Sequence, residues 1–492
     1  MHFIVKIFSE ITLKSPPLRK CLVKRLRQNL SVLLDNVDDS IKVKSDWDRI
    51  EVYSKHSTEV MAAETAKVLS CTPGIANFSK VQPHEMGDLE HIYQKTLSVW
   101  SDQLAGKTFV VRVRRHGKHE FNSMEIERYV GSGLSTHTEN AGVKLKNPDV
   151  TVRLEIKNDD LYVVQQQTPG LGGFPIGSQE PVLSLVSGGF DSTVSSYLMI
   201  KRGLRTHYCF FNLGGVAHEA AVKEVVYFLW NKFSSSHRVK FVTVNFEPVV
   251  NEIVQNVKSS HMGVVLKRMM LRAATQIADE MNIQALVTGE AVAQVSSQTL
   301  TNLAVIDSST DKLVLRPLIV MDKGDIIDHS RKIGTENFSA SIPEYCGVIS
   351  VKPTTCASEE KVAGEEANFD MAVLDAAVAD KKVQLIDRVV DDLLREGNGP
   401  VVKQVAEPGP NSVVIDIRHP DEEELRPLLR KGCLADIEVL KIPFFSLNTR
   451  LAKLDKHTEY LLYCQKGVMS TLHSAHLKDD GFINVGVYRP EK

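Results

Sequence analysis

The residues with the clearest chemical meaning are Ser187-Gly188-Gly189-Phe190-Asp191-Ser192, which directly follow the apolar run 183–186. A buried strand that ends in a glycine-rich turn before a helix directs free backbone N–H groups at one point, which suits the phosphates of a nucleotide. No Gly-Lys-Ser/Thr follows, so the loop differs from that of kinases and GTPases. Asp191 could help to hold Mg²⁺ beside the phosphates. The segment predicts a nucleotide site, with a plain strand-to-helix turn as the alternative.

Further polar residues could complete this site. Lys267 lies near the start of an expected helix and could neutralise phosphate. Gly289-Glu290 follow the expected strand 285–288, and the segment 294–302 offers neutral hydrogen-bonding groups for a ribose or base. For each of these residues a purely structural role is the alternative.

Cys464 is the second chemical feature. The apolar run 461–463 leads into a tight loop with Gly467, and a helix is expected over 471–478. Loop amides and a helix N-terminus would stabilise a thiolate or persulfide and lower the thiol pKa, and Lys466 adds positive charge. A buried cysteine at a strand end is the alternative.

Cys346 stands in the turn Ile342-Pro-Glu-Tyr-Cys-Gly347, where an exposed thiol could form a reversible bond or be an ordinary loop cysteine. Cys356 is a rival for the same role. The chain has seven cysteines but no Cys-x-x-Cys pair, so we expect free thiols and no metal site.

Composition narrows the class of protein. The chain has 492 residues and a net charge of -2, but basic residues gather in the segment 14–27 and at Lys107, Arg112, Arg114, Arg115 and Lys118. A basic cluster of this kind is either a solvated surface or a site of RNA contact, and both interpretations stay open here. No apolar run approaches the roughly 18 residues of a membrane span, and the N-terminus lacks the pattern of a signal peptide, so we expect a cytoplasmic protein without membrane contact.

The order of expected elements indicates a multidomain α+β and α/β protein. An α+β region of about 170 residues, in two lobes, ends at the Gly- and Pro-rich segment 169–177. Regular β–α alternation follows, with strands at 182–186, 207–212, 239–245 and 285–288, which predicts a doubly wound parallel sheet. The acidic stretch 359–395 is expected to be helical, and a small α/β domain follows Glu407-Pro-Gly-Pro410.

Ser-Gly-Gly-x-Asp-Ser resembles the PP-loop of ATP pyrophosphatases, which adenylate an acceptor and release pyrophosphate. The loop around Cys464, in a domain that starts Val413-Val-Ile-Asp-Ile-Arg418, resembles the rhodanese domains that carry sulfur as a cysteine persulfide. It departs from them at Met469 and Ser470, where an arginine often closes the loop. Residues 106–117 with Ser123-Met-Glu125 resemble a THUMP domain, an RNA-binding module.

Taken together, the chain resembles the tRNA 4-thiouridine synthetases, also called tRNA sulfurtransferases, in the long form with a C-terminal rhodanese domain. The likeness also covers Phe210–Gly215, Leu266–Met270, Val287–Glu290, Gln294–Asn302 and Pro343–Ser350. It implies a ferredoxin-like domain at 1–58, a THUMP domain at 59–168, a doubly wound PP-loop adenylation domain at 178–396 and a small α/β rhodanese domain at 406–492.

The resemblance also implies a reaction. ATP with Mg²⁺ adenylates O4 of the uridine at position eight of tRNA, and sulfur carried on Cys464 then displaces AMP, with no permanently bound cofactor. Cys346 would form a disulfide with Cys464 as sulfur leaves. The implied ATP-binding residues are Leu185, Val186, Ser187, Gly188, Gly189, Asp191, Ser192, Lys267, Gly289 and Gln298. The implied partners are tRNA, a cysteine desulfurase as sulfur donor and a sulfur-carrier protein of thiamine thiazole synthesis.

Two other interpretations stay open at this point. The chain could be a different PP-loop enzyme, such as an amide ligase or a lysidine-type tRNA modifier, in which sulfur plays no part. It could also be a non-catalytic RNA-binding and sulfur-relay protein with a decayed ATP site. The intact loop at 187–192 argues against the second.

Overall fold

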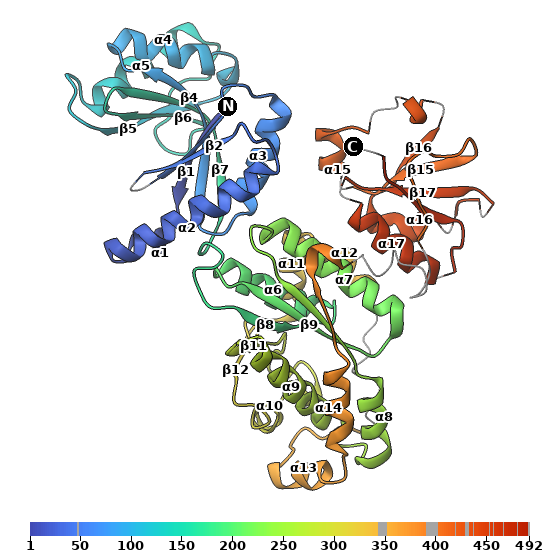
Figure 1. Cartoon of the computed structure of the whole chain (residues 1–492). Helices are drawn as coiled ribbons and strands as arrows, with labels where there is room; N and C mark the ends of the chain where they lie inside the picture. The colour runs from blue at the N-terminus through green and yellow to red at the C-terminus, as the bar shows by residue number, and fades with distance from the viewer. Residues whose placement is uncertain are drawn as a thin grey trace. The chain divides into compact units, whose positions relative to one another are not determined.

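The structure is a computed structural model that describes residues 1–490 except 47–48, 343–351, 390–401, 419, 429–431, 436, 452, 456, 466 and 480. The chain forms two compact units, Met1–Pro175 and Ile176–Lys492. Figure 1 shows their elements. Each unit is described by itself below.

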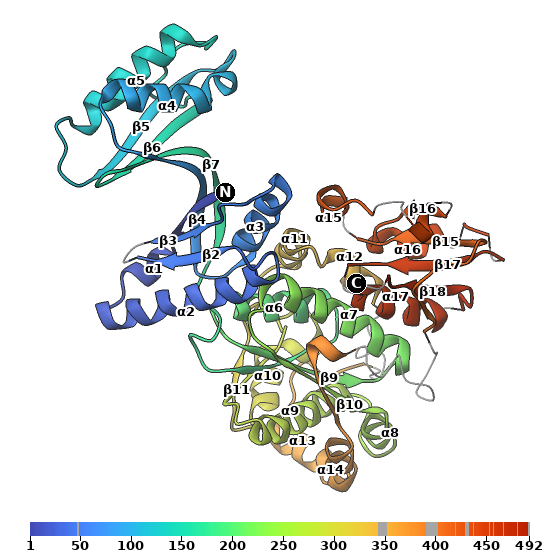
Figure 2. The same cartoon turned by 45° about the horizontal axis from the view of Figure 1, so that its top comes forward.

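The first unit is built on one seven-stranded sheet in the order β2-β3-β1-β4-β7-β6-β5. Its strands are β1 (His2–Ile7), β2 (Lys42–Ser45), β3 (Arg49–Tyr53), β4 (Ile75–Glu85), β5 (Phe109–His116), β6 (Val150–Lys157) and β7 (Asp160–Gly172). The long strands β4 and β7 pair along their length and pass through both lobes (Figure 2). The two lobes of this unit are therefore joined by the continuous backbone hydrogen bonding of β4 and β7.

Helices give each lobe a separate core. They are α1 (Ser9–Thr12), α2 (Pro16–Asp35), α3 (Glu59–Cys71), α4 (Leu89–Trp100) and α5 (Ser123–His137). In α2, Leu22, Leu26, Leu30 and Leu34 recur at helical spacing and are all buried, which leaves the basic residues of this segment on its outer side. Helix α5 begins with a capping box between Asn122 and Glu125.

The second unit contains a six-stranded sheet in the order β12-β11-β8-β9-β10-β13. Its strands are β8 (Val182–Leu185), β9 (Thr206–Asn212), β10 (Lys240–Asn245), β11 (Ala285–Val287), β12 (Leu313–Leu315) and β13 (Lys382–Leu385). The predicted strands β8 to β11 are parallel, as expected; β12, which was not predicted, joins β11 parallel, and β13 joins β10 antiparallel. The prediction of a helical stretch over 359–395 is confirmed for 359–366 and 371–379 but wrong for 382–385, which form the edge strand β13, and residues 390–395 lie outside the described residues.

Both faces of this sheet are covered by helices. They are α6 (Phe190–Lys201), α7 (Gly215–Phe233), α8 (Glu247–Asn256), α9 (Met262–Glu280), α10 (Leu300–Asp307), α11 (Lys323–Ile333), α12 (Glu336–Ser341), α13 (Glu359–Glu366) and α14 (Met371–Ala379). Along β9, Tyr208 and Phe210 pack toward α7 and α12, whereas Cys209 and Phe211 pack toward α8 and α9. Burial on both faces explains the continuous apolar run of this strand.

The C-terminal part of the second unit is a five-stranded parallel sheet in the order β14-β18-β17-β15-β16. The strands are β14 (Gln404–Val405), β15 (Ser412–Asp416), β16 (Glu438–Lys441), β17 (Glu459–Tyr463) and β18 (Val485–Tyr488), with helices α15 (Pro420–Leu425), α16 (Leu447–Leu451) and α17 (Val468–Asp479). We call residues 402–490 the C-terminal domain. In the described part of the chain, no helix is long and apolar enough to cross a membrane.

The buried side chain of His207 on β9 links protonation to the stability of the second unit. Its Nδ1 accepts the backbone N–H of Lys240 at 2.9 Å. Burial, helped by the charges of Arg205 and Lys240, lowers the pKa of His207 from 6.5 to about 4. The unfolded chain therefore binds a proton below about pH 6.5 that the folded chain takes up only near pH 4, so this group destabilises the fold as the pH falls.

Acidification from roughly pH 7 to pH 5 should lower the free energy of unfolding in both proteins. We expect this loss to be about 2 kcal/mol smaller in His207→Gln than in the unsubstituted protein. Glutamine can still accept the N–H bond but does not titrate in this range. Urea unfolding at both pH values measures the difference, with the exposed His457→Gln as control. An equal acid loss in both variants would contradict the assignment.

Candidate functional site

The strand order of the second sheet creates a crevice beside β8. From β8 the chain continues to β9 and β10 on one side and later to β11 and β12 on the other. At such a switch point the connections leave in opposite directions, and ligands bind outside the carboxyl ends of the strands. The loop 187–192 follows β8, and Thr288-Gly289-Glu290 follow β11, so both lie at this point.

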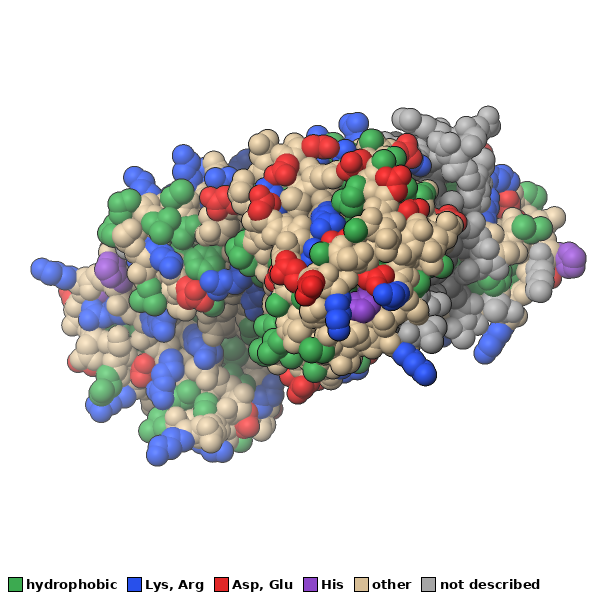
Figure 3. Space-filling view, turned by 90° about the horizontal axis from the view of Figure 1, so that it is seen from below, with side chains coloured by type: hydrophobic (Ala, Val, Ile, Leu, Met, Phe, Trp, Pro, Cys, Tyr) green, Lys and Arg blue, Asp and Glu red, His purple; other side chains and the backbone are tan. Residues whose placement is uncertain are grey.

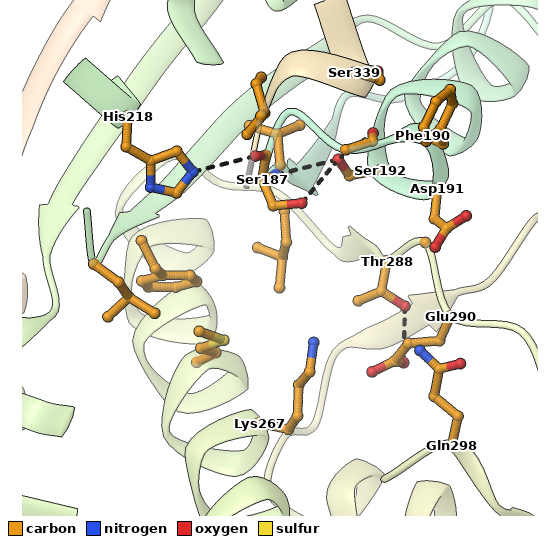
Figure 4. Close-up of a pocket in the computed structure, with 18 of the residues that line it drawn as sticks. Ser187, Phe190, Asp191, Ser192, His218, Lys267, Thr288, Glu290, Gln298 and Ser339 are labelled. Carbon is orange, nitrogen blue, oxygen red and sulfur yellow. Dashed lines mark hydrogen bonds between the residues drawn. The ribbon is translucent and has the colours of Figure 1, made fainter. Parts of the chain in front are cut away.

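A cavity of about 350 Å³ occupies the crevice. The residues predicted to bind ATP line this one cavity, with the exception of Gly188: they are Leu185, Val186, Ser187, Gly189, Asp191, Ser192, Lys267, Gly289 and Gln298. Figure 4 shows Lys267 directed from α9 into the cavity and the serines of the loop opposite it. Tertiary folding thus brings together residues that are more than 100 positions apart in the sequence.

The loop is held by its own hydroxyl groups and by one histidine. Ser192 Oγ accepts the N–H of Ser187 at 3.2 Å, and Thr193 Oγ1 donates to the carbonyl of Gly189 at 2.9 Å. His218 from α7 lies with Nε2 3.4 Å from the carbonyl oxygen of Ser187 (Figure 4). Gly188 has φ +80° and backs onto Ile342, so its place in the loop is structural: it lets the chain turn.

Gly289 closes the other side of the cavity by close backbone approach. A Cβ atom at this position would lie 2.6 Å from the carbonyl carbon of Asp191 and 2.7 Å from the nitrogen of Ser192. Only glycine allows the end of β11 to reach the first turn of α6. This contact joins the two halves of the site.

Charged residues that the sequence alone did not single out complete the site. Lys323, the first residue of α11, places Nζ 2.8 and 3.0 Å from the two carboxylate oxygens of Asp191. Gln294, from the segment predicted to offer neutral groups to a ribose or base, donates its Nε2 hydrogen to the same carboxylate at 2.8 Å. Nothing in the sequence around Lys323 or His218 distinguishes them from ordinary helix residues, so only the folded arrangement reveals them.

A second carboxylate, Glu290, is buried at the cavity wall and is held through one of its oxygens. Its Oε2 accepts from Arg316 Nε at 2.8 Å and from Thr288 Oγ1 at 3.1 Å. Arg316 in turn binds both oxygens of Asp307. Burial disfavours the charged guanidinium of Arg316, but the carboxylates of Glu290 and Asp307 outweigh burial. The pKa of Arg316 therefore lies above its ordinary value. This network fixes the wall of the cavity and pairs the Glu290 carboxylate with a cation.

Among the described residues, no three His, Cys, Asp or Glu side chains come together as a metal site. Asp191 and Glu290 both line the cavity, and Asp191 is the one that lies on the phosphate loop itself. One such group suits a Mg²⁺ ion that arrives already bound to phosphates, because Mg²⁺ on nucleotides takes few protein ligands.

The predicted sulfur-carrying residue Cys464 lies between β17 and α17. Its Sγ accepts the N–H of Ser470 at 3.3 Å and lies 3.4 Å from Ser470 Oγ. Gly467 has φ +76°, which turns the loop so that α17 begins at Val468, directly after it. The geometry is that of a cysteine in a nest of loop amides.

The prediction that the loop lowers the thiol pKa was wrong. Burial is the largest effect and raises the pKa of Cys464, while the hydrogen bonds from Ser470, Gly467 and Met469 only oppose it. Lys466, expected to add positive charge, lies outside the described residues. Cys346, expected to pair with Cys464, also lies outside them, whereas its rival Cys356 is exposed.

The residues predicted to contact RNA lie on or just beside β5, the edge strand of the first unit. Lys107, Arg112, Arg114 and Lys118 are exposed and Arg115 is half-buried. Because side chains alternate along a strand, Arg112 and Arg114 share one face, and Arg115 lies on the other, where its Nη1 is 3.0 Å from His119 Nδ1. Figure 3 shows many Lys and Arg side chains on the surface of this unit, at the left of the view.

Comparison with known proteins matches this architecture. The family described as "Thiamine biosynthesis protein (ThiI)" matches residues 177–371, a THUMP domain matches 87–164, and a ThiI ferredoxin-like domain matches 2–79. The predicted fold class, including these three domains, is thereby confirmed. The division of the chain at 58, 168, 178, 396 and 406 and the rhodanese assignment stay predictions.

Curated relatives match over the full chain. A tRNA sulfurtransferase of Saccharophagus degradans is 56% identical over 490 residues, and one of Colwellia psychrerythraea is 55% identical over 491 residues, with 100% of each chain covered in both cases.

Solved structures match as well. A 4-thiouridine synthetase–RNA complex with bound ATP is 26% identical, with a TM-score of 0.69 over 78% of this chain and 99% of that chain. PH1313 from Pyrococcus horikoshii, 20% identical with a TM-score of 0.54 over 68% of this chain and 100% of that one, shares the fold. The chain belongs to the tRNA sulfurtransferase family of enzymes.

Proposed function

We propose that this protein uses ATP to transfer persulfide sulfur to the uridine at position eight of tRNA and forms 4-thiouridine. The observation that carries the proposal is the single cavity lined by the loop 187–192, Lys267, Gly289 and Gln298. Support comes from the relatives named tRNA sulfurtransferase and from the matched 4-thiouridine synthetase, whose structure contains RNA and ATP.

Adenylation makes the uracil oxygen displaceable. Uridine O4 attacks the α-phosphate of ATP and pyrophosphate leaves, so that O4 becomes part of an AMP leaving group. Backbone N–H groups of the loop and the ammonium group of Lys267 would bind the phosphates and stabilise the charge that develops on them. Mg²⁺ would enter with the nucleotide, with Asp191 and Lys323 arranging the charges around it.

Sulfur would then arrive from Cys464. The terminal sulfur of its persulfide attacks C4, and AMP leaves with the bonding electrons of the C4–O4 bond. The thiolate of Cys346 next attacks Sγ of Cys464, which forms the Cys346–Cys464 disulfide and leaves both electrons of the broken S–S bond on the sulfur at C4. A cellular thiol reductant returns the pair to thiols.

The donor of the sulfur is proposed to be a cysteine desulfurase. The family description "Thiamine biosynthesis protein" supports a second acceptor, a sulfur-carrier protein of thiazole synthesis. The exposed basic residues of β5 would hold tRNA phosphates, which position the RNA without reading its sequence. Shape would therefore select the uridine.

Cys464→Ser should reduce 4-thiouridine to background while adenylation still proceeds, because the variant lacks the sulfur carrier but keeps the ATP cavity. The measurement incubates protein, ATP, Mg²⁺, tRNA and a persulfide donor and analyses the nucleosides. Cys346→Ser should stop catalytic turnover, and Cys356→Ser serves as its control. Full activity in both Cys464→Ser and Cys346→Ser would favour a PP-loop enzyme without sulfur chemistry.

Gly289→Ala should weaken ATP binding about 10-fold or more, because the added methyl group has only backbone to displace. Isothermal titration with a non-hydrolysable ATP analogue measures the change. Gly364→Ala in α13 is the matched control, since its Cβ would meet no atom within 4 Å. Equal affinity in the two variants would show that ATP binds elsewhere.

Arg114→Gln should lower tRNA affinity and reduce the slope of log affinity against log salt by about one, as expected when one phosphate contact is lost. Filter binding over a range of salt concentrations measures both quantities. Arg450→Gln, an equally exposed arginine in the C-terminal domain, should change neither. An unchanged slope in Arg114→Gln would remove this face of β5 from the RNA interface.

A further inference from the structure

The C-terminal domain makes specific contacts with the nucleotide domain inside the second unit. Helix α17, which begins next to the Cys464 loop, packs along α7. Val468 and Met469, its first two residues, join the apolar cluster that contains Val186 and Val222 of the nucleotide domain. Ile342 belongs to the same cluster, lines the ATP cavity and touches Gly188. The cysteine loop and the phosphate loop therefore share one apolar wall.

Aromatic side chains give this contact a defined geometry. Phe444 of the C-terminal domain stacks on Phe338 of α12, with ring centroids 4.6 Å apart and an interplanar angle of 14°. Phe228 of α7 lies 6.1 Å from the same ring of Phe444. Aromatic pairs have preferred ring geometries, so they favour one orientation of the two domains in addition to burying apolar area.

One buried pair of polar side chains, His473 and Glu224, crosses the contact. His473 Nε2 of α17 lies 2.5 Å from Glu224 Oε1 of α7, and the two side chains are 8% and 5% exposed. The two atoms do not meet as an aligned hydrogen bond, and they form a salt bridge when the imidazole of His473 carries a proton. A buried pair of this kind adds little net stability, but removal of one member leaves the other polar group buried without its partner. Such a pair suits the selection of one docked position.

Cys464 lies close to this contact. Burial and then the charge of Cys464 raise the pKa of Tyr227, three residues after Glu224 on α7. The thiol is half-buried, and burial raises its own pKa. A large sulfur donor needs an open path to Sγ, whereas transfer needs Cys464 beside the nucleotide cavity.

We propose that α7 and α12 form a docking face for the C-terminal domain, and that Glu224 and His473 are positioning residues that hold Cys464 at the nucleotide domain for sulfur transfer and release it for loading. The proposal rests on the proposed function for its catalytic meaning. The docking itself is a physical property that is measured without any reaction.

The first measurement is the rate at which iodoacetamide alkylates Cys464 in the full chain, read by peptide mass spectrometry. Glu224→Gln should raise this rate roughly tenfold, because the undocked population grows. Exposed Cys356 is the internal control. Lys441→Gln, which breaks the ion pair between exposed Lys441 and half-buried Glu423 within the C-terminal domain, is the matched variant and should alkylate like the unsubstituted protein. An unchanged rate at Cys464 in Glu224→Gln would overturn the proposal.

The exchanged double variant Glu224→His with His473→Glu keeps both groups but swaps their helices. It should return the alkylation rate to within about twofold of the unsubstituted protein, because the pair is restored. If Glu224→Gln merely unfolded α7, the exchange would not rescue it, and the proposal would fall.

The second measurement separates the two sulfur steps. Thiosulfate loads Cys464, and the preloaded protein is then mixed with ATP and tRNA. In Glu224→Gln the loading rate should stay equal or rise, while formation of 4-thiouridine falls roughly tenfold. If Glu224→Gln slowed sulfur loading and 4-thiouridine formation equally, a loss of docking could not be the cause. If the unsubstituted protein loads sulfur but makes no 4-thiouridine, the proposed function fails, while the alkylation result still decides the docking.

Discussion

The close approach of Gly289 to the backbone of Asp191 and Ser192 is the contact on which the nucleotide site depends. It brings the end of β11 against the first turn of α6 and so closes the crevice that the strand order opens beside β8. A side chain at Gly289 would force these elements apart. Lys267, Gln298 and Lys323 reach the same cavity only because this contact sets its width.

A second constraint concerns charge. Asp191 is held by Lys323 and Gln294, and Glu290 by Arg316 and Thr288, so each carboxylate at the cavity already has partners. Phosphates that enter such a site meet backbone amides and ammonium groups in place of unpaired acids. Preorganised donors of this kind stabilise developing negative charge without reorganisation during the reaction.

In the proposed reaction the thiol of Cys464 must meet two partners in turn, the external sulfur donor and the adenylated uridine. The Cys464 loop offers amide donors, yet burial outweighs them and raises the thiol pKa. The apolar wall shared by Val468, Met469 and Ile342 gives a physical reason for that burial, since the loop faces the nucleotide domain. The proposed docking and release of the C-terminal domain reconciles a protected thiol with an external sulfur donor.

Local patterns were enough for strands β8 to β11, the phosphate loop and the cysteine loop. Apolar runs, glycine turns and helix starts act over a few residues, so Ser187–Ser192 and Cys464 stand out in the amino-acid order alone. The same patterns missed β13, His218, Lys323 and the pairing of Glu224 with His473, and they misjudged the thiol pKa. These features arise from side chains that are distant in the chain and meet only after packing, where burial and partner charges replace local propensity.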